Sequence, residues 1–219
     1  MVIGIVGSRR RNAKQDRKAV RLAYESLVEQ SGKPVDQITL CSGLCPQGGD
    51  EFARQFAEAN GHPTLWFPAE WDKHGRAAGF IRNTDIAENS EWLIACVSPD
   101  RKGGTEDTVT KFIKAHGIDR LIIVGVPGPK PVLVHKDSSR FTSAKRSERV
   151  YIGRPSKWGN PFDHRIEGKK VAIAKHRAWI MTEYKMLASL RTLWGKTLGC
   201  FCPPNACHGD TLVELSQRI

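Results

Sequence analysis

The feature that most constrains the fold of this chain is a regular alternation of short apolar runs and helix-like stretches over its first 126 residues. Five runs rich in β-branched residues have the length of buried strands, at 2–6, 37–41, 64–67, 92–97 and 121–126. Segments with apolar residues at helical spacing separate them, at 12–30, 50–60, 79–87 and 105–116. Strands that alternate with helices form right-handed crossovers, so we predict an α/β fold with a Rossmann-like, mainly parallel sheet.

Residues 127–131 interrupt this pattern. They read Pro-Gly-Pro-Lys-Pro, which cannot continue a helix or a strand. We therefore predict a Rossmann-like domain at residues 1–127 and a second, smaller and basic α+β domain at residues 132–219. Its predicted elements are strands at 132–135, 150–153 and 197–200, a mobile loop at 137–149, a long helix at 169–190 and a closing helix at 210–218.

The positive charge of the chain is concentrated in its C-terminal part. The formal net charge is +11, and residues 131–219 hold 16 Lys and Arg against 7 Asp and Glu, a net +9. Such an asymmetry favours a polyanionic partner, DNA or RNA first, and a basic solvated surface is the alternative.

Two observations bear on the location of the protein. No apolar run approaches the length of a membrane span. The apolar start at 1–6 is followed at once by arginines, the reverse of the order in a secretory signal. We expect a cytoplasmic protein with no membrane partner, and a homo-oligomer remains open.

Polar, glycine-containing segments follow four of the predicted strands. All strand C-termini of a parallel sheet lie at one edge, so these segments converge on the crevice where open α/β sheets bind ligands. Glycines let backbone N–H groups approach an anion, and helix N-termini favour phosphate. We therefore predict a site for a nucleotide or nucleotide-derived ligand. Its predicted residues are Gly7, Ser8, Arg9, Ser42, Gly43, Gly49, Asp50, Trp71, Arg82, Asn83, Gly103, Gly104 and Thr105.

Several of these residues have a structural alternative. Arg82 and Asn83 either clamp a phosphate or base, or cap a helix and satisfy local backbone groups. Trp71 either stacks on a base or belongs to the core. Asp50 or Glu70 could hold ribose hydroxyls.

The same segments resemble those of the SLOG superfamily, in its YspA-like, cpYpsA-related branch. The motifs that carry the resemblance are Gly7-Ser8-Arg9, Ser42-Gly43 with Gly48-Gly49-Asp50, the run from Phe67 to Trp71, Gly75 with Arg82-Asn83, and Gly103-Gly104-Thr105. The resemblance implies a Rossmann-like sheet that binds nucleotides or nucleotide-derived molecules. It also implies two activities, cleavage of an N-glycosidic bond in a nucleoside monophosphate or sensing of NAD- or ADP-ribose-derived signals.

The chain departs from the hydrolytic members of that superfamily at one position. Their Gly-Gly-x-Gly-Thr-x-x-Glu loop ends on a carboxylate, whereas Thr108 stands three residues after Thr105 here. Glu70, expected at the same edge of the sheet, is the candidate catalytic carboxylate in its place.

The run from Tyr151 to Phe162 is dense in glycine, proline, cations and aromatics. Arg154, Lys157, Trp158 and Asn160 are its candidate ligand-binding residues, because cations beside an aromatic suit a phosphate and a stacked base. The alternative is a tight structural turn in which Trp158 and Phe162 fill the core.

A cysteine–histidine cluster lies near the C-terminus, and three interpretations of it remain open. Disulfides are not expected in a cytoplasmic chain. The first is a zinc site; the second is a reactive Cys202 or Cys207 with His208 as proton carrier; the third is buried cysteines beside a turn. No other cofactor is required. The candidate metal ligands are Cys200, Cys202, Cys207 and His208.

The second half also resembles a small domain of unknown function found in phage and bacterial proteins. The run 151–162 and the Cys–His end carry this resemblance, which covers about residues 132–219. It implies a phage or mobile-element origin and no established activity.

Three functions follow as hypotheses. The first is an enzyme that cleaves or exchanges an N-glycosidic bond of a nucleotide, with the basic domain presenting or modifying nucleic acid or a second nucleotide. The second is a non-catalytic binder of a signalling nucleotide, as in phage immune evasion. The third is a nucleic-acid-binding protein whose Rossmann unit is a scaffold.

Overall fold

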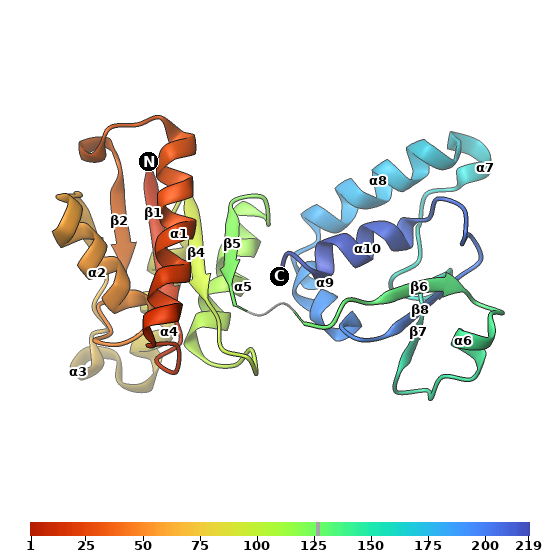
Figure 1. Cartoon of the computed structure of the whole chain (residues 1–219), viewed down its shortest axis with the longest axis horizontal. Coiled ribbons are helices and arrows are strands. Elements are labelled where there is room, and N and C mark those ends of the chain that lie inside the picture. Colours follow the sequence, from red (N-terminus) through yellow and green to blue (C-terminus); the bar gives the residue numbers. More distant parts are fainter. Residues whose placement is uncertain (126–127) are drawn as a thin grey trace. The chain divides into compact units, whose positions relative to one another are not determined.

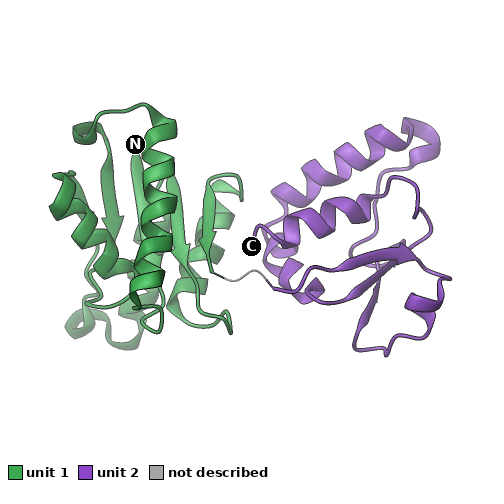
Figure 2. Cartoon of the chain, viewed as in Figure 1, with its two compact units in different colours: residues 1–126 green, residues 127–219 purple. Residues whose placement is uncertain are grey.

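The chain forms two compact units, Met1–Val126 and Pro127–Ile219 (Figure 2). The structure is a computed structural model that describes residues 1–125 and 128–219. Residues 126 and 127, where we placed the end of the fifth strand and of the first domain, lie outside the described residues. That the parts 1–127 and 132–219 are independently folding domains stays a prediction.

The first unit is a five-stranded sheet in which every strand pairing is parallel, as predicted. Its strands lie in the order β3-β2-β1-β4-β5. The strands are β1 (Val2–Gly7), β2 (Thr39–Ser42), β3 (Thr64–Trp66), β4 (Trp92–Cys96) and β5 (Leu121–Val124). Because the chain moves outward to β3 and then returns to the far side of β1, the order reverses between β1 and β4, which is where such sheets bind ligands.

Helices cover both faces of this sheet. On one face α1 contacts α2, and on the other α4 packs against α5 (Figure 1). The bounds are α1 (Lys14–Ser31), η1 (Val35–Gln37), α2 (Gly49–Asn60), α3 (Trp71–His74), η2 (Gly75–Ala77), α4 (Ala78–Asn89) and α5 (Gly104–His116). The predicted helices differ from these by a few residues at their ends, and the short turns η1, α3 and η2 were not predicted.

The core of the first unit explains why the spacing of apolar residues predicted its strands and helices. Ile3 and Ile5 of β1 are fully buried, and they pack with Val20 of α1 and Phe52 and Phe56 of α2. Burial in β1 is continuous from Ile3 to Val6, because helices cover both faces of the sheet, and the buried residues of the helices repeat at helical spacing.

The second unit has a three-stranded sheet in the order β6-β8-β7, with both pairings parallel. The mixed α/β class is thus confirmed for the chain. The strands are β6 (Val132–His135), β7 (Arg149–Tyr151) and β8 (Thr197–Cys200). The helices are α6 (Ser139–Thr142), α7 (His164–Glu167), α8 (Lys169–Thr182), α9 (Tyr184–Ser189), η3 (Leu190–Leu193) and α10 (His208–Ser216).

The predicted helix over 169–190 is wrong as a single element. It breaks at Glu183, whose φ of −93° and ψ of 84° are not helical. After the break, Leu187, Leu190 and Leu193 are all fully buried. Burial of these leucines outweighs continuity of the helix.

The predicted loop over 137–149 contains one ordered helical turn, α6. The Phe141 ring of this turn lies over Gly199, where an added Cβ would overlap it. The Arg149 guanidinium donates hydrogen bonds to the carbonyls of Phe141 and Thr142, each at 2.9 Å. Tertiary contacts thus order a segment whose local sequence has no helical pattern. Among the described residues, no helix is long and apolar enough to cross a membrane.

Candidate functional site

A cavity of about 680 Å³ lies at the carboxyl edge of the five-stranded sheet, where β1 and β4 end. It is lined by residues from all four of the polar segments that the sequence indicated. The predicted residues that line it are Gly7, Ser8, Arg9, Asp50, Trp71, Arg82, Asn83, Gly103, Gly104 and Thr105. The residues that the prediction missed include Arg10, Cys45, Gln47 and Lys102.

The remaining predicted residues do not line the cavity but shape it. Ser42 is buried and its hydroxyl donates to the Ile5 carbonyl at 2.7 Å. Gly43 leaves room for the Arg82 side chain, which an added Cβ would meet. Gly49 lies so close to Gly7 that a Cβ on either residue would overlap the backbone of the other. These three residues therefore allow the close packing of the segments at this edge of the sheet.

Glu70, the candidate catalytic carboxylate, is absent from the residues that line this cavity. Its side chain is 59% exposed and pairs with Lys73 at 3.3 Å and with His74 at 3.5 Å. The structure therefore places Glu70 on the surface beside its own helix, because the chain turns into α3 directly after it.

Asn83 and Asp50 are held by the fold itself. The Asn83 amide donates to the Gly104 carbonyl at 3.1 Å and to Asp107 at 3.0 Å, and so fastens α4 to the start of α5. Asp50 accepts the Cys45 N–H at 3.1 Å. Burial raises the pKa of Asp50, although that N–H and the nearby Arg82 oppose the shift. Asn83 thus corresponds to the structural alternative given for it, and Asp50 is held by backbone groups of the edge.

The remaining polar groups of this cavity suit an anion. Among the described residues, the side chains of Arg9 and Lys102 have no ion-pair or hydrogen-bond partner. The helix α5 begins at Gly104 without a side-chain cap, which leaves its first backbone N–H groups available. The Trp71 ring is 59% exposed and lines the same cavity, so it does not belong to the core.

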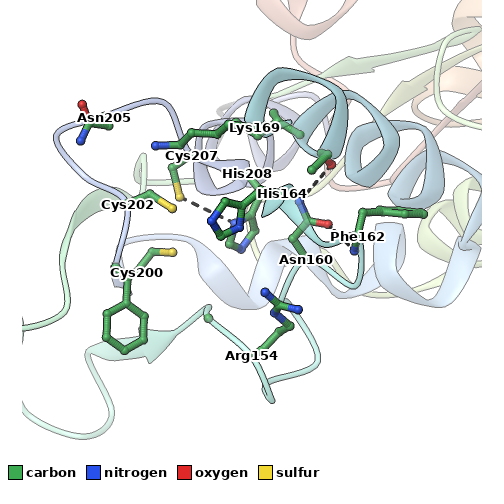
Figure 3. Close-up of a pocket in the computed structure, with 14 residues that line it drawn as sticks. Arg154, Asn160, Phe162, His164, Lys169, Cys200, Cys202, Asn205, Cys207 and His208 are labelled. Atoms are coloured by element: carbon green, nitrogen blue, oxygen red, sulfur yellow. Dashed lines mark hydrogen bonds between the residues drawn. The ribbon is translucent and has the colours of Figure 1, made fainter. Parts of the chain in front are cut away.

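The second unit brings the cysteine–histidine cluster together. Cys200 ends β8, and Cys207 and His208 begin α10. The ligand atoms of these three buried residues all lie within 4.8 Å of one another. Figure 3 shows the thiols of Cys200, Cys202 and Cys207 pointing toward a common space beside the His208 ring.

The hydrogen bonds of His208 fix which ring nitrogen faces the thiols. Nε2 lies 2.8 Å from the Ile152 carbonyl, so Nε2 carries the proton and donates. Nδ1, 3.7 Å from the Cys207 sulfur, then keeps its lone pair toward the cluster. A backbone acceptor on the far nitrogen is the usual partner of a metal-binding imidazole.

The thiols are electrostatically linked. A hydrogen bond from Cys207 lowers the pKa of Cys200 to about 5. The same hydrogen bond, together with burial, raises the pKa of Cys207. Burial raises the pKa of Cys202, next to the Cys200 thiolate. Hydrogen bonding among the three thiols therefore favours the thiolate form of Cys200 and the protonated form of the other two.

A second cavity, of about 360 Å³, adjoins this cluster. The candidate residues Arg154, Asn160, Cys200, Cys202, Cys207 and His208 line it, together with residues that the sequence prediction missed: His164, Lys169, Phe201 and Asn205. Phe201 and Asn205 lie inside the cysteine–histidine run, which marked their position but not their role, whereas α7 and α8 bring His164 and Lys169 to the cavity only in the folded unit.

Three residues of the run 151–162 are engaged in packing. Trp158 is 3% exposed, and the Lys157 ammonium lies 4.6 Å from its ring centroid. This burial corrects the expectation that Trp158 stacks on a ligand and matches the alternative of a core plug. Asn160 donates to the Ala172 carbonyl and accepts the Phe162 N–H, each at 2.9 Å, so it clamps the loop to α8.

Comparison with known proteins finds a matching family for the second unit. Residues 134–218 match the family described as a domain of unknown function (DUF4326), which agrees with the resemblance seen in the sequence. No solved structure matches the chain, and the SLOG resemblance of the first unit stays a prediction. The chain is 31% identical over 74 residues to an "Uncharacterized 12.4 kDa protein in nrdA-td intergenic region" of Enterobacteria phage T4, covering 32% of this chain and 68% of the phage protein. With this identity and coverage, the chain belongs to the same protein family as that phage protein, and its residues 134–218 match DUF4326.

Proposed function

We propose that the first unit binds a nucleotide or nucleotide-derived ligand in the cavity between the ends of β1 and β4. The observation that carries the proposal is the convergence of ten predicted residues, from loops far apart in sequence, on this one cavity. The cavity sits at the reversal of strand order, where α/β sheets bind ligands.

The cavity has separate groups for the two parts of a nucleotide. The phosphate meets the first N–H groups of α5 and the unpaired cations of Arg9 and Lys102. The base stacks on the exposed Trp71 ring. The resemblance to SLOG proteins supports the same ligand class.

The proposal is for binding, and N-glycosidic cleavage is not part of it. Glu70, the candidate catalytic carboxylate, lies outside the cavity, and Asp50, the carboxylate that lines it, accepts backbone N–H groups. A general acid or base has to reach the reacting atoms. The arrangement therefore favours a binder or sensor over a hydrolase or transferase.

The test is isothermal titration of the full chain with AMP, NAD and ADP-ribose. We expect Arg9→Ala to weaken binding by about tenfold or more, because it removes a charge-assisted hydrogen bond. Trp71→Ala should weaken it by a similar factor through lost stacking. Arg17→Ala, an exposed arginine of α1, is the matched control and should bind normally. No heat with any of these ligands, or equal affinities in all variants, would refute the proposal.

We propose as a second function that the cysteine–histidine cluster holds a zinc ion. The observation that favours it is the grouping of two buried thiols with an imidazole nitrogen whose partner nitrogen is hydrogen-bonded to a carbonyl. Thiolate and imidazole are the preferred ligands of zinc. Cys200, Cys207 and His208 would hold the ion, with Cys202, whose thiol hydrogen-bonds to both other thiols, as the fourth ligand.

Metal analysis of protein purified without chelator tests this proposal. We expect bound zinc in the natural chain and its loss in Cys200→Ser and His208→Ala. The control is Cys45→Ser, which changes a half-buried cysteine of the first unit. Protein that is free of metal and takes up no added zinc would rule out the centre.

A further inference from the structure

We propose that the second unit binds single-stranded nucleic acid along a basic groove between α6 and the edge strand β7. The groove has a volume of about 720 Å³. This inference depends on neither the nucleotide site of the first unit nor the zinc centre. The residues that line the basic groove are Lys136, Phe141, Thr142, Arg146, Arg149, Val150 and Tyr151.

The positive charge of the second unit is concentrated in the segment that forms this groove. Residues 136–157 hold seven Lys and Arg against two Asp and Glu, a net +5 of the +9 that residues 131–219 carry. No Asp or Glu is among the residues that line the groove. A surface of one sign attracts a polymer of the opposite sign, and nucleic acid is the common polyanion.

Two exposed cations of this segment are available to phosphates. The side chains of Lys145 and Arg146 make no ion pair or hydrogen bond with any residue that the structure describes. Lys136, by contrast, is paired with Asp137 at 2.6 Å, so much of its charge is neutralised. Lys145 and Arg146 are therefore the residues that we expect to contact phosphates.

The third cation, Arg149, is fixed in place before any ligand binds. Its Nη1 atom donates to the carbonyls of Phe141 and Thr142, each at 2.9 Å, and its guanidinium lies 5.4 Å from the centroid of the Phe141 ring. Both acceptors are neutral, so the guanidinium keeps its charge, and Nε and Nη2 remain for a ligand. A guanidinium that is already ordered loses little entropy when it binds a phosphate.

Three rings stand where the three strands of this sheet end. His135 is the last residue of β6, Tyr151 is the last residue of β7, and Phe201 directly follows β8. The strands lie side by side in Figure 1, and the pairing of His135 with Cys200 and of Tyr151 with Gly199 keeps their ends level. The Phe201 ring meets His135 and Tyr151 edge-on, at 6.4 Å and 6.3 Å between centroids. The parallel sheet thus builds an aromatic cluster at its carboxyl edge, where open α/β sheets bind ligands.

Phe201 adjoins the basic groove and is exposed although it is apolar. Tyr151 and Lys136, which both line the groove, contact its ring, and the Lys136 ammonium lies 4.6 Å from the ring centroid. Phe201 itself is 60% exposed. An exposed ring beside cations that bind phosphate is a platform for an unpaired base. The bases of a duplex are stacked inside it and do not reach such a ring, so a single strand fits both the cations and the ring.

The test is fluorescence anisotropy of the full chain with labelled oligodeoxyuridylate and oligouridylate strands of about ten nucleotides. We expect binding that weakens as salt rises and a weaker affinity for a duplex of the same length. Lys145→Ala and Arg146→Ala should each reduce the slope of log affinity against log salt by about 0.7, the contribution of one phosphate contact on a single strand. Lys185→Ala, an exposed lysine of α9 that does not line the groove, is the control and should change neither affinity nor slope.

The contribution of the aromatic ring is tested separately. Phe201→Ala should weaken binding about tenfold through lost stacking, and Phe201→Trp should retain it. An abasic strand of the same length should bind the natural chain and Phe201→Ala equally, whereas a misfolded variant would lose that strand too. Phe80→Ala is the matched control and should bind normally. Phe80 is also 60% exposed and has the Lys111 ammonium 5.7 Å from its ring centroid, but it belongs to the first unit.

Four outcomes would overturn the inference. They are a duplex that binds as tightly as the single strand, a Lys185→Ala variant as weak as Arg146→Ala, an unchanged affinity of Phe201→Ala for the strand that carries bases, and a loss of strand binding in Arg9→Ala. The last would place the strand on the first unit, whereas strand binding that survives in Arg9→Ala supports a site in the second unit. The two labelled strands differ only in the 2′-hydroxyl, so the tighter one identifies the nucleic acid as DNA or RNA.

Discussion

At the residue scale, Gly49 shows how tightly the ligand edge is built. An added Cβ there would overlap the backbone of Val6 and Gly7 at the end of β1. We predict that Gly49→Ala lowers the free energy of unfolding by ~1–3 kcal/mol, as overpacking does, measured by urea denaturation. Gly104→Ala is the matched control, since Gly104 also begins a helix at this edge and its Cβ would lie 3.5 Å from the Asn83 amide nitrogen, an ordinary contact. Equal stability of the two variants would contradict the prediction.

The neighbouring acids Asp50 and Glu51 should have opposite effects on the pH dependence of stability. Burial raises the folded-state pKa of Asp50, so its carboxylate costs stability as the pH rises from its unfolded value near 4. Hydrogen bonds from Arg54 lower the pKa of Glu51, so its contribution is lost as the pH falls.

We therefore expect the stability of Asp50→Asn, relative to the natural chain, to improve from pH 3 to pH 7. The relative stability of Glu51→Gln should worsen over the same range. Urea denaturation as a function of pH measures both, and slopes of the same sign would show that the environment of one acid is misassigned.

At the scale of the element, the start of α10 carries two of the proposed metal ligands, Cys207 as its N-cap and His208 as its first residue. The Asp210 carboxylate accepts the Cys207 N–H at 2.9 Å, and the Cys207 sulfur accepts the Gly209 N–H at 3.3 Å. This reciprocal cap fixes the backbone that presents Cys207 and His208. The helix start and the cluster are therefore one structural feature.

We predict that Asp210→Ala lowers the free energy of unfolding by ~1 kcal/mol through loss of the cap and also reduces zinc retention. Glu214→Ala, one turn further along α10, is the control. Its carboxylate makes an exposed pair with Arg177 at 2.6 Å, worth at most about 1 kcal/mol, and zinc content should not change. Normal zinc content in Asp210→Ala would show that the cap is not needed for metal binding.

At the scale of the whole molecule, the two compact units should respond separately to metal removal. The proposed ligands all belong to the second unit. We predict two thermal transitions by differential scanning calorimetry. A chelator should lower the midpoint temperature of only one of them, because bound metal stabilises only the unit that holds it. Gly49→Ala, in the first unit, should lower the midpoint temperature of the other transition. A single transition that shifts as a whole would show that 1–127 and 132–219 are not independent domains.

The net charge of residues 131–219 also belongs to this scale. A net +9 predicts that any binding of DNA or RNA weakens steeply with salt.

Local patterning was sufficient for the architecture of the first unit. Its strands are buried runs such as Val2–Gly7, and its helices repeat apolar residues every three to four positions, so both are readable within a short window. The rule that parallel strands end at one edge then placed Ser8, Arg9 and Thr105 together, as the cavity shows. The cysteine cluster was equally visible, because its members lie within nine consecutive residues.

Only the tertiary structure decided what depends on contacts between distant segments. It exposed Trp71 and Phe201, buried Trp158, and turned Glu70 away from the cavity. It broke the helix at Glu183 and placed Lys169 beside Cys200 and His208, more than thirty residues further along the chain. Burial and proximity are set by which faces of different elements pack together, and the spacing of residues within one element does not contain that information.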